Sequence, residues 1–280
     1  MKLPKLKTIL LAPVILFAAF YSVGVIINLS SQETVPVLGS APARHETVAI
    51  FGASGTAGDG ILKAALANPE SRQILVVTRR LTPRIEQGAA SGRVQVTMHQ
   101  DYLDYSAISD KLPRLDAVYW AIGISSLGMD EETYGMIHVD FPVNFVTAWM
   151  NAGIKPGSSF HYISSSDISE DSSQMWAREK VRAEKSLFSL AEATNLRVIV
   201  YRPDYIGPTE EEAGLGQTLL YWFFKPVGAA VKATQIGQAM MEVTARGSEF
   251  SNGDRLSTRM ILRYSNAYEA GLALKGDSGY

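Results

Sequence analysis

The feature that most constrains the fold is a strand, a glycine-rich turn and a helix that follow one another directly. The segment TVAIFGASGTAGDGILKAAL begins with the short apolar strand Thr47–Phe51, passes through three glycines spaced three residues apart, and continues with helical spacing. In such a turn the first glycine permits a tight bend, the second lets the backbone approach a pyrophosphate, and the third lets helix and strand pack closely. The helix N-terminus then faces the anion. The predicted cofactor-binding residues of this turn are Gly52, Ser54, Gly55, Thr56 and Gly58.

Strands and helices alternate after this unit, as in parallel βαβ units with right-handed crossovers. We therefore predict an α/β fold, a Rossmann-type doubly wound parallel sheet that binds ligands beyond the carboxyl ends of its strands. The later strands are predicted at Gln73–Thr78, Val94–His99, Ala117–Ile122, Phe160–Ser164 and Arg197–Arg202. The later helices are predicted at Tyr105–Leu112, Glu131–Asn151 and Ser173–Ala193.

The end of the second strand indicates which dinucleotide is bound. Arg79 and Arg80 stand there in place of the acidic residue that accepts hydrogen bonds from a ribose 2′-hydroxyl. Guanidinium groups bind a 2′-phosphate, so the pattern favours NADP over NAD, and an ordinary solvated arginine pair is the competing interpretation. Asp101, just past the third strand, is expected either to meet the adenine amino group or to cap its loop.

The N-terminus predicts a single membrane-spanning helix. Between Lys7 and Glu33 lie 25 uncharged residues, and Thr8–Leu29 is almost wholly apolar. At about 1.5 Å per residue, about 20 helical residues cross a hydrocarbon core of about 30 Å. A cleaved signal peptide is the alternative, but its apolar run is usually only about 7–15 residues long with a small-residue site directly behind it. Here the Ala-Pro-Ala at residues 41–43 lies well downstream, which favours an uncleaved anchor.

Two considerations disagree on the orientation of the folded domain. Lys2, Lys5 and Lys7 precede the span, and the positive-inside rule then sends the domain across the membrane. A cofactor supplied in the cytosol requires the opposite, and we favour a cytosol-facing domain. The predicted organisation is a membrane anchor over residues 1–29, a linker over 30–46, an NAD(P)-binding domain over 47–246 and a weakly defined C-terminal tail over 247–280.

Composition excludes several other classes of function. A formal net charge of -2 and a pI near 6.1 provide no basic field for a phosphate backbone, so nucleic acid is not expected as a partner. The chain has no cysteine, and its 4 histidines are never spaced four residues apart. No metal site is therefore predicted. The expected partners are a small-molecule substrate, the membrane and, in one alternative below, another protein.

Taken together, these motifs resemble the short-chain dehydrogenase/reductase superfamily, and within it atypical members similar to Tat-interacting-protein-like oxidoreductases. The resemblance rests on FGASGTAGDG, VVTRR, AIGISS, HVDFPV, YISSSD, WAREKVRAEKSL and VYRPDYIGP, in this order between Thr47 and Arg246. It implies a serine that orients the substrate oxygen, a tyrosine that transfers a proton, and a lysine that holds the nicotinamide ribose and lowers the pKa of the phenol. It also implies that Gly123 contacts the cofactor and that Arg202 and Pro203 close the nicotinamide side, unless they form a plain strand-ending turn.

The resemblance assigns Ser164 or Ser165 to the serine and Lys180 to the lysine, but Trp176 stands where the tyrosine is expected. Trp176 and Lys180 are four residues apart, hence on one helix face. An indole N–H donates a hydrogen bond but has no usable acidity near neutral pH, so the proton requires another source. The candidate substitutes are Tyr134, Tyr162 and Tyr205.

Two classes of function follow from this replacement. One is a membrane-anchored NADP-dependent oxidoreductase that acts on a carbonyl or hydroxyl compound with a non-standard proton donor. The other is a catalytically degenerate nucleotide-binding sensor or scaffold. Trp176 itself either forms a wall over the substrate or packs as an ordinary helix aromatic. The aromatic segment Leu219–Val231 either lines the core or a pocket, or rests on a bilayer.

Overall fold

A seven-stranded sheet in which all neighbouring strands run parallel organises the domain. The computed structural model describes residues 6–30, 34–37, 46–211 and 213–277. The strand order is β3-β2-β1-β4-β5-β6-β9, which places the first strand in the interior of the sheet. This is the doubly wound arrangement that the sequence predicts. The strands are β1 (Thr47–Phe51), β2 (Gln73–Thr78), β3 (Val94–Met98), β4 (Ala117–Trp120), β5 (Ser159–Ile163), β6 (Arg197–Arg202) and β9 (Arg255–Ser257).

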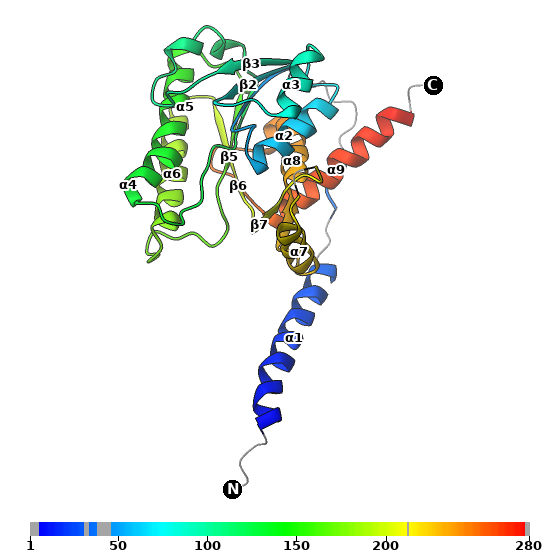
Figure 1. The fold of residues 1–280 in the computed structure, drawn as a ribbon. Coiled ribbons are helices and arrows are strands. Elements are labelled where there is room, and N and C mark those ends of the chain that lie inside the picture. Colours follow the sequence, from blue (N-terminus) through cyan, green and yellow to red (C-terminus); the bar gives the residue numbers. More distant parts are fainter. Residues whose placement is uncertain (1–5, 31–33, 38–45, 212, 278–280) are drawn as a thin grey trace.

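Helices cover both faces of the sheet (Figure 1). One layer contains α2 (Thr56–Ala67), α8 (Ala233–Arg246) and α9 (Thr258–Asp277), and the other contains α5 (Phe141–Ala152) and α6 (Met175–Glu192). The short helix α4 (Glu131–Gly135) leads through the π-helical turn Met136–Asp140 into α5. Helix α3 (Pro83–Ala90) packs beside β3, and α7 (Leu215–Phe224) lies against a small parallel pair, β7 (Tyr205–Gly207) and β8 (Ala230–Lys232).

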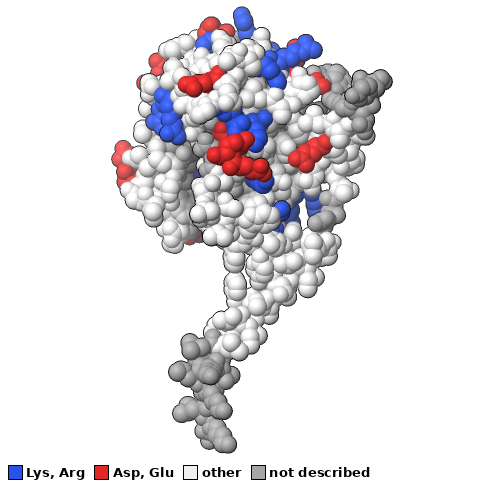
Figure 2. All heavy atoms as spheres, turned by 45° about the vertical axis from the view of Figure 1, so that its right-hand side comes forward, with Lys and Arg blue, Asp and Glu red and all other residues white. Residues whose placement is uncertain are grey.

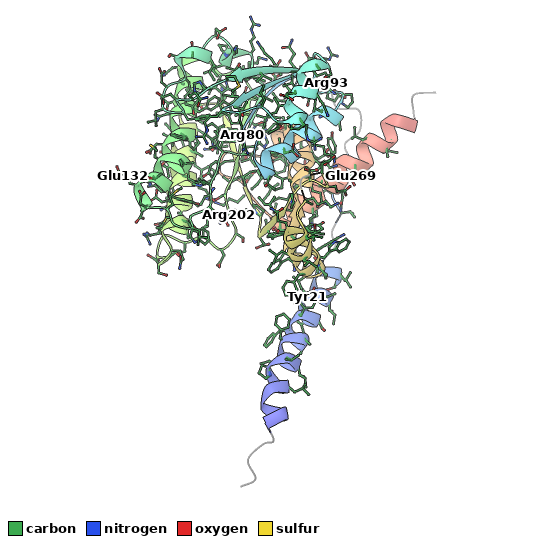
Figure 3. All side chains as sticks on the ribbon, in the orientation of Figure 1. Tyr21, Arg80, Arg93, Glu132, Arg202 and Glu269 are labelled. Atoms are coloured by element: carbon green, nitrogen blue, oxygen red, sulfur yellow. The ribbon has the colours of Figure 1, made fainter. Side chains whose placement is uncertain are left out.

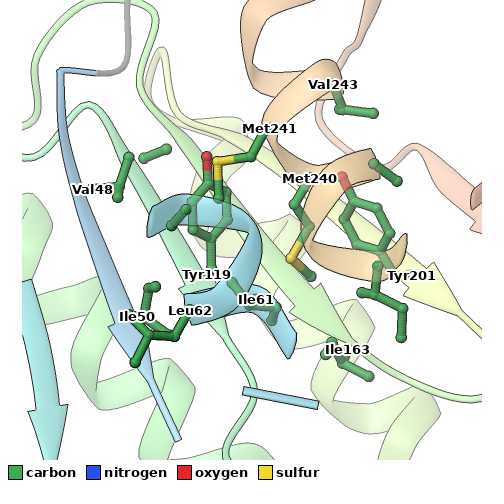
Figure 4. Close-up of a cluster of buried hydrophobic side chains, with 14 of the residues drawn as sticks. Val48, Ile50, Ile61, Leu62, Tyr119, Ile163, Tyr201, Met240, Met241 and Val243 are labelled. Carbon is green, nitrogen blue, oxygen red and sulfur yellow. The ribbon is translucent and has the colours of Figure 1, made fainter. Parts of the chain in front are cut away.

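The side chains of β1 alternate between two hydrophobic cores, as the two-residue period of a strand requires. Val48 and Ile50 join the core under α2 and α8, whereas Ala49 and Phe51 join the core under α5 and α6. Figure 4 shows the first of these cores, with side chains of α2 and α8 facing the strands. Burial on both faces explains why the strand is apolar throughout.

The C-terminal segment is part of the sheet, so the prediction of a weakly defined tail after Arg246 is wrong. Strand β9 pairs in parallel with β6, with Tyr201 opposite Leu256, and α9 then packs along α8. Only Leu256 of the three strand residues is buried, so this strand has no hydrophobic run from which it can be recognised.

The predicted helix Tyr105–Leu112 is also wrong, because two 3₁₀ turns, Ser106–Ile108 and Leu112–Arg114, replace it. Asp104 accepts hydrogen bonds from both the backbone N–H and the hydroxyl of Ser106, at 2.9 Å each. Such side-chain bonds compete with helical backbone bonds. Pro113 further prevents a continuous helix, because proline lacks the N–H donor.

The N-terminal helix α1 (Leu6–Ser30) projects away from the domain (Figure 1). Its segment Pro13–Ser30 has a mean hydropathy of 1.9, is not buried, and is long and apolar enough to cross a membrane. The predicted linker over residues 30–46 lies largely outside the described residues. In its described part, the carbonyl of Pro36 accepts a hydrogen bond of 2.6 Å from Arg246 of α8.

Candidate functional site

The glycine turn after β1 has the geometry that its sequence predicts. Gly52 has φ +81°, and a Cβ there would lie 2.6 Å from the backbone carbon of Ala121. A Cβ on Gly58 would lie 2.0 Å from the carbonyl oxygen of Gly52, so only glycine lets α2 pack onto the turn. Gly55 is different, because a Cβ there would meet only the Gly52 oxygen, at 3.5 Å. The N-terminus of α2 is therefore approachable from outside.

A cavity of about 470 Å³ lies beside this turn, at the carboxyl ends of β1, β2 and β4. It contains Arg79 and Arg80, as predicted, and the Arg80 guanidinium donates a hydrogen bond of 2.8 Å to the carbonyl of Ser54. Figure 3 shows Arg80 near the centre of the sheet edge. Arg79 is exposed and has no carboxylate partner among the described residues. Its charge is therefore available to an anion. The cavity is lined by Gly52, Ser54, Gly55, Thr78, Arg79, Arg80, Tyr102, residues 121–124, Met136, Ile137 and Phe141.

A second cavity of about 700 Å³ adjoins the first across Gly55 and residues 121–124. It brings together side chains from the ends of β5 and β7 and from α4, α6 and α7. All the residues predicted for the catalytic centre lie on its wall. These residues are Ser164, Ser165, Trp176 and Lys180, and the predicted cofactor residues Thr56 and Gly123 line the same cavity.

Lys180 is the buried cation of this cavity. Its Nζ donates a hydrogen bond of 3.0 Å to the carbonyl of Ile163 and lies 5.0 Å from the ring centre of Tyr162. Burial lowers the pKa of Lys180 to about 7, and the carboxylate of Glu184 opposes that shift. The amine therefore changes its charge near neutral pH.

Ser164 and Trp176 occupy the cavity in different ways. The Ser164 hydroxyl is buried and has no hydrogen-bond partner among the described residues, although it lines the cavity. A buried hydroxyl without a partner carries a desolvation cost that a bound polar group relieves. Trp176, on the first turn of α6, is half-buried and lines the same cavity. It is a wall residue of the cavity and not a fully packed core aromatic.

The three tyrosines considered as proton sources lie in different environments. Tyr162 is fully buried, and its hydroxyl donates a hydrogen bond of 3.0 Å to the carbonyl of His138. Tyr205 lines the cavity, but its hydroxyl donates to the carbonyl of Gln217 at 3.2 Å. Tyr134 also lines the cavity, and burial together with the carboxylate of Glu179 raises its pKa to about 12. Tyr134 is thus a protonated phenol at the cavity wall.

His138, to which the sequence assigns no role, lies beside Tyr134. It belongs to the π-helical turn after α4, and its ring stacks on that of Tyr134 with centroids 4.0 Å apart. Burial and, to a smaller extent, the nearby Lys180 lower the pKa of His138 to about 3. His138 is therefore neutral under ordinary conditions. Its position within HVDFPV is the only sequence signal that marks it, because π-helical turns recur at functional sites but cannot be read from spacing.

Solved structures of other proteins have the same fold as this chain, although comparisons of the sequence find no relative. No protein-family model matches this sequence, and neither does any curated protein. A UDP-glucuronic acid 4-epimerase from Bacillus cereus in complex with NAD has a TM-score of 0.59 and 14% identity, over 75% of this chain and 77% of its own. A 3-oxoacyl-[acyl-carrier protein] reductase from Brucella melitensis in complex with NAD has a TM-score of 0.58 and 17% identity, over 78% and 97%. BdcA in complex with NADPH has a TM-score of 0.57 and 14% identity, over 75% and 91%.

These structures share the fold of this chain, a doubly wound parallel sheet with helices on both faces. The residues at this edge of the sheet fit a nicotinamide dinucleotide. The open Gly55 backbone at the start of α2 suits a pyrophosphate, and the unpartnered Ser164 hydroxyl and the Lys180 amine lie in the adjoining cavity. These residues have the chemistry that a nicotinamide dinucleotide requires, and they do not distinguish NADP from NAD.

Four residues proposed for the cofactor line neither cavity, namely Gly58, which packs α2 onto the turn, and Asp101, Arg202 and Pro203. Asp101 is exposed, and its carboxylate accepts a hydrogen bond of 2.9 Å from the N–H of Leu103, which is the loop-cap interpretation. Arg202 forms two hydrogen bonds with Glu184, at 2.9 and 2.5 Å, so its guanidinium binds a carboxylate of the protein. The carbonyl of Pro203 accepts a hydrogen bond from Ser166. Arg202 is therefore the last residue of β6, paired with Ser257, and Pro203 follows directly in the connection to β7.

Proposed function

We propose that this protein is a membrane-anchored NADP(H)-dependent oxidoreductase that acts on a carbonyl or hydroxyl compound. The observation that carries the proposal is the pair of adjoining cavities. One cavity contains the glycine turn with Arg79 and Arg80, and the other contains Ser164, Trp176 and Lys180. Cofactor-binding and reactive groups thus meet along one edge of the sheet, where such folds bind ligands.

The preference for NADP rests on Arg79 and Arg80. Both line the first cavity, and Arg79 has no carboxylate partner among the described residues that would compete with a 2′-phosphate. Isothermal titration should show tighter binding of NADP(H) than of NAD(H). Arg79→Ala should weaken NADP(H) binding by about tenfold or more and leave NAD(H) binding nearly unchanged, because a charged hydrogen bond contributes about 1.5–3 kcal/mol. Arg72→Ala, at an exposed arginine outside both cavities, is the matched control. If the parent and Arg79→Ala each bind NADP(H) and NAD(H) with equal affinity, the proposed preference for NADP is wrong.

The side chains around the second cavity divide the remaining tasks. In this proposal a bound nicotinamide dinucleotide supplies or accepts the hydride. Ser164 offers its free hydroxyl to the substrate oxygen, and Lys180 holds the ribose. Tyr134 supplies the proton, because among the described residues it is the cavity-lining phenol whose hydroxyl is not donated to a backbone carbonyl. Trp176 forms a wall against the substrate.

The alternative function is a nucleotide-binding sensor or scaffold that has lost the reaction and serves a protein partner. It is favoured by one observation, the indole of Trp176 at the position where a phenol is expected, because an indole transfers no proton. In this alternative the cavities bind the cofactor, but no hydride is transferred to or from it.

Two substitutions separate the alternatives through NADPH oxidation with a panel of carbonyl compounds. If Tyr134 is the acid, Tyr134→Phe should lower turnover by about 10²-fold, and Trp176→Tyr in that background should restore it. If the protein is a scaffold, the parent should be inactive, Tyr134→Phe should have no effect, and Trp176→Tyr alone should create activity. A parent whose turnover survives Tyr134→Phe would show that water or the substrate itself provides the proton.

Membrane anchoring through α1 belongs to the same proposal. Its support is the length and hydropathy of Pro13–Ser30, all of it unburied. We place the domain on the cytosolic side, where reduced nicotinamide is supplied, against the orientation that the preceding lysines favour. Protease protection in sealed vesicles distinguishes the two, since a protected domain would establish the opposite orientation.

A further inference from the structure

Helix α7 presents an uncharged apolar face to the outside of the domain. Its sequence LGQTLLYWFF contains no charged residue. Leu215 is 88% exposed, Leu219 is 70% exposed and Trp222 is 60% exposed, and Phe223 is also exposed. These residues are spaced four, three and one apart and therefore share one side of the helix. We call Leu215, Leu219, Trp222 and Phe223 the outer face of α7.

The opposite side of α7 belongs to the cavity. Gln217 lines the cavity that contains Ser164 and Lys180, and its carbonyl accepts the hydrogen bond from Tyr205. One turn further on, Tyr221 is buried against Gly207, where a Cβ would lie 2.8 Å from the Tyr221 ring. Helix α7 thus separates the candidate active site from the surroundings of the protein.

The apolar helix α1 runs alongside the C-terminal end of α7. The Tyr21 hydroxyl donates a hydrogen bond of 2.8 Å to the carbonyl of Phe223, and the Phe223 ring lies 6.2 Å from that of Phe17. Beyond α7, Asn28 donates to the carbonyl of Pro226 at 3.2 Å. Figure 3 shows Tyr21 on α1 where the helix passes α7.

These contacts fix the depth of α7 if α1 crosses a bilayer. At about 1.5 Å per residue, Tyr21 and Phe17 lie about 14 and 20 Å along the helix from Ser30. Phe223 contacts both, so the end of α7 lies at the level of the hydrocarbon core and not above the headgroups. Figure 2 agrees, because the neck between domain and α1 is uncharged in that view, whereas Lys, Arg, Asp and Glu gather on the body above it.

We propose that the outer face of α7 is immersed in the lipid bilayer beside α1, and that the substrate is a lipid-soluble carbonyl or alcohol that enters the cavity past α7 from the membrane. The substrate part rests on the proposed function, whereas the bilayer contact does not. A bilayer is favoured over a protein partner because the outer face continues the unburied apolar surface of α1. The first charged residue after α7 is Lys225, whose Nζ lies 4.9 Å from the centre of the Trp222 ring. At a membrane surface, a lysine can lay its apolar stem along such a ring while its ammonium group reaches the headgroups.

Tryptophan fluorescence of the full chain tests the bilayer contact. In vesicles of phosphatidylcholine with brominated acyl chains, Trp222 should be quenched, whereas Trp120 and Trp149 are fully buried. Trp222→Phe should therefore abolish most of the quenching. Leu219→Glu should reduce it in the otherwise unchanged chain, and Leu274→Glu, at an exposed leucine of α9, should not. Quenching that is absent, or unchanged by Trp222→Phe, overturns the proposal. If Trp222 is not quenched but the chain still binds NADP(H), the bilayer contact of α7 is wrong and the proposed oxidoreductase function is unaffected.

Trp176 reports on the substrate class, because it lines the cavity. In the Trp222→Phe chain, hexadecanol brominated beside its hydroxyl should quench Trp176 saturably from vesicles, and Trp176→Phe should remove that signal. Bromoethanol, which is too small and polar to partition, should quench only weakly and without saturation. Equal quenching by the two alcohols, or none by the long one, overturns delivery from the membrane.

Discussion

At the scale of single residues, the titration of the second cavity depends on Lys180. Of the titratable side chains that line this cavity, His138 has its pKa lowered to about 3 and Tyr134 has its pKa raised to about 12. Burial raises the pKa of Tyr205 as well. Lys180, with a pKa of about 7, is then the group that changes charge near neutrality. Its amine is protonated below that pH and neutral above it.

Cofactor affinity should therefore fall as pH rises through about 7. The protonated amine attracts the anionic dinucleotide and donates a stronger hydrogen bond than the neutral one, a difference of about tenfold in affinity. Titration calorimetry should use NAD(H) beside NADP(H), because a 2′-phosphate itself titrates near pH 6. Lys180→Met should bind weakly at every pH with a flat profile. A variant that keeps the slope of the parent would assign the titration to another group.

Sequence spacing predicts the residues whose place depends on local structure and misses those that depend on tertiary contacts. Gly52, Ser164 and Lys180 follow strands or occupy one helix face, so their meeting at one sheet edge follows from topology. The role of Arg202 could not be predicted, because Glu184 on a different element binds its guanidinium. The sequence leaves three candidate phenols, and the hydrogen bonds that Tyr162 and Tyr205 donate to backbone carbonyls favour Tyr134.

At the scale of elements, Glu184 of α6 connects the last strand to the rest of the sheet. Its carboxylate is 1% exposed and accepts hydrogen bonds from Arg202 of β6 and from Arg255 of β9, the latter at 3.0 Å. Besides its backbone pairing with β6, strand β9 is held in the sheet by this ion pair and by a single buried leucine, Leu256. Neither signal is visible in the local pattern, which explains why β9 and α9 escape prediction whereas the longer apolar strands β1, β2 and β6 do not.

Glu184→Ala should lower the free energy of unfolding by about 2–3 kcal/mol, because it removes charged hydrogen bonds and leaves two arginines beside a vacated site. Glu192→Ala, at an exposed glutamate in the last turn of the same helix, should change it by less than about 0.5 kcal/mol. Urea unfolding of the two variants measures the difference. Equal stabilities would mean that the backbone pairing of β6 and β9 suffices without the ion pair.

At the scale of the whole molecule, the cavity with Lys180 lies between the cavity at the glycine turn and helix α7, which contacts α1. The sequence contains both apolar segments, but their relation is a long-range contact, since Tyr21 and Phe223 are 202 residues apart. No spacing rule connects them. The sequence consequently left open whether the aromatic segment lines a pocket or rests on a bilayer. In the structure one side of α7 lines the cavity, and the opposite side is exposed beside α1.

This arrangement leads to a prediction for a chain that lacks residues 1–31. Its domain should fold and bind NADP(H), because both buried cores begin at Val48 or later and include no residue of α1. It should nevertheless bind vesicles reversibly, because removal of α1 uncovers Phe223 and leaves the outer face of α7 in place. Adding Leu219→Glu and Trp222→Glu should release it into the aqueous fraction of a flotation assay with its cofactor affinity intact. A truncated chain that is already fully aqueous would mean that α1 alone holds the protein at the membrane, and that α7 contacts lipid only because α1 brings it there.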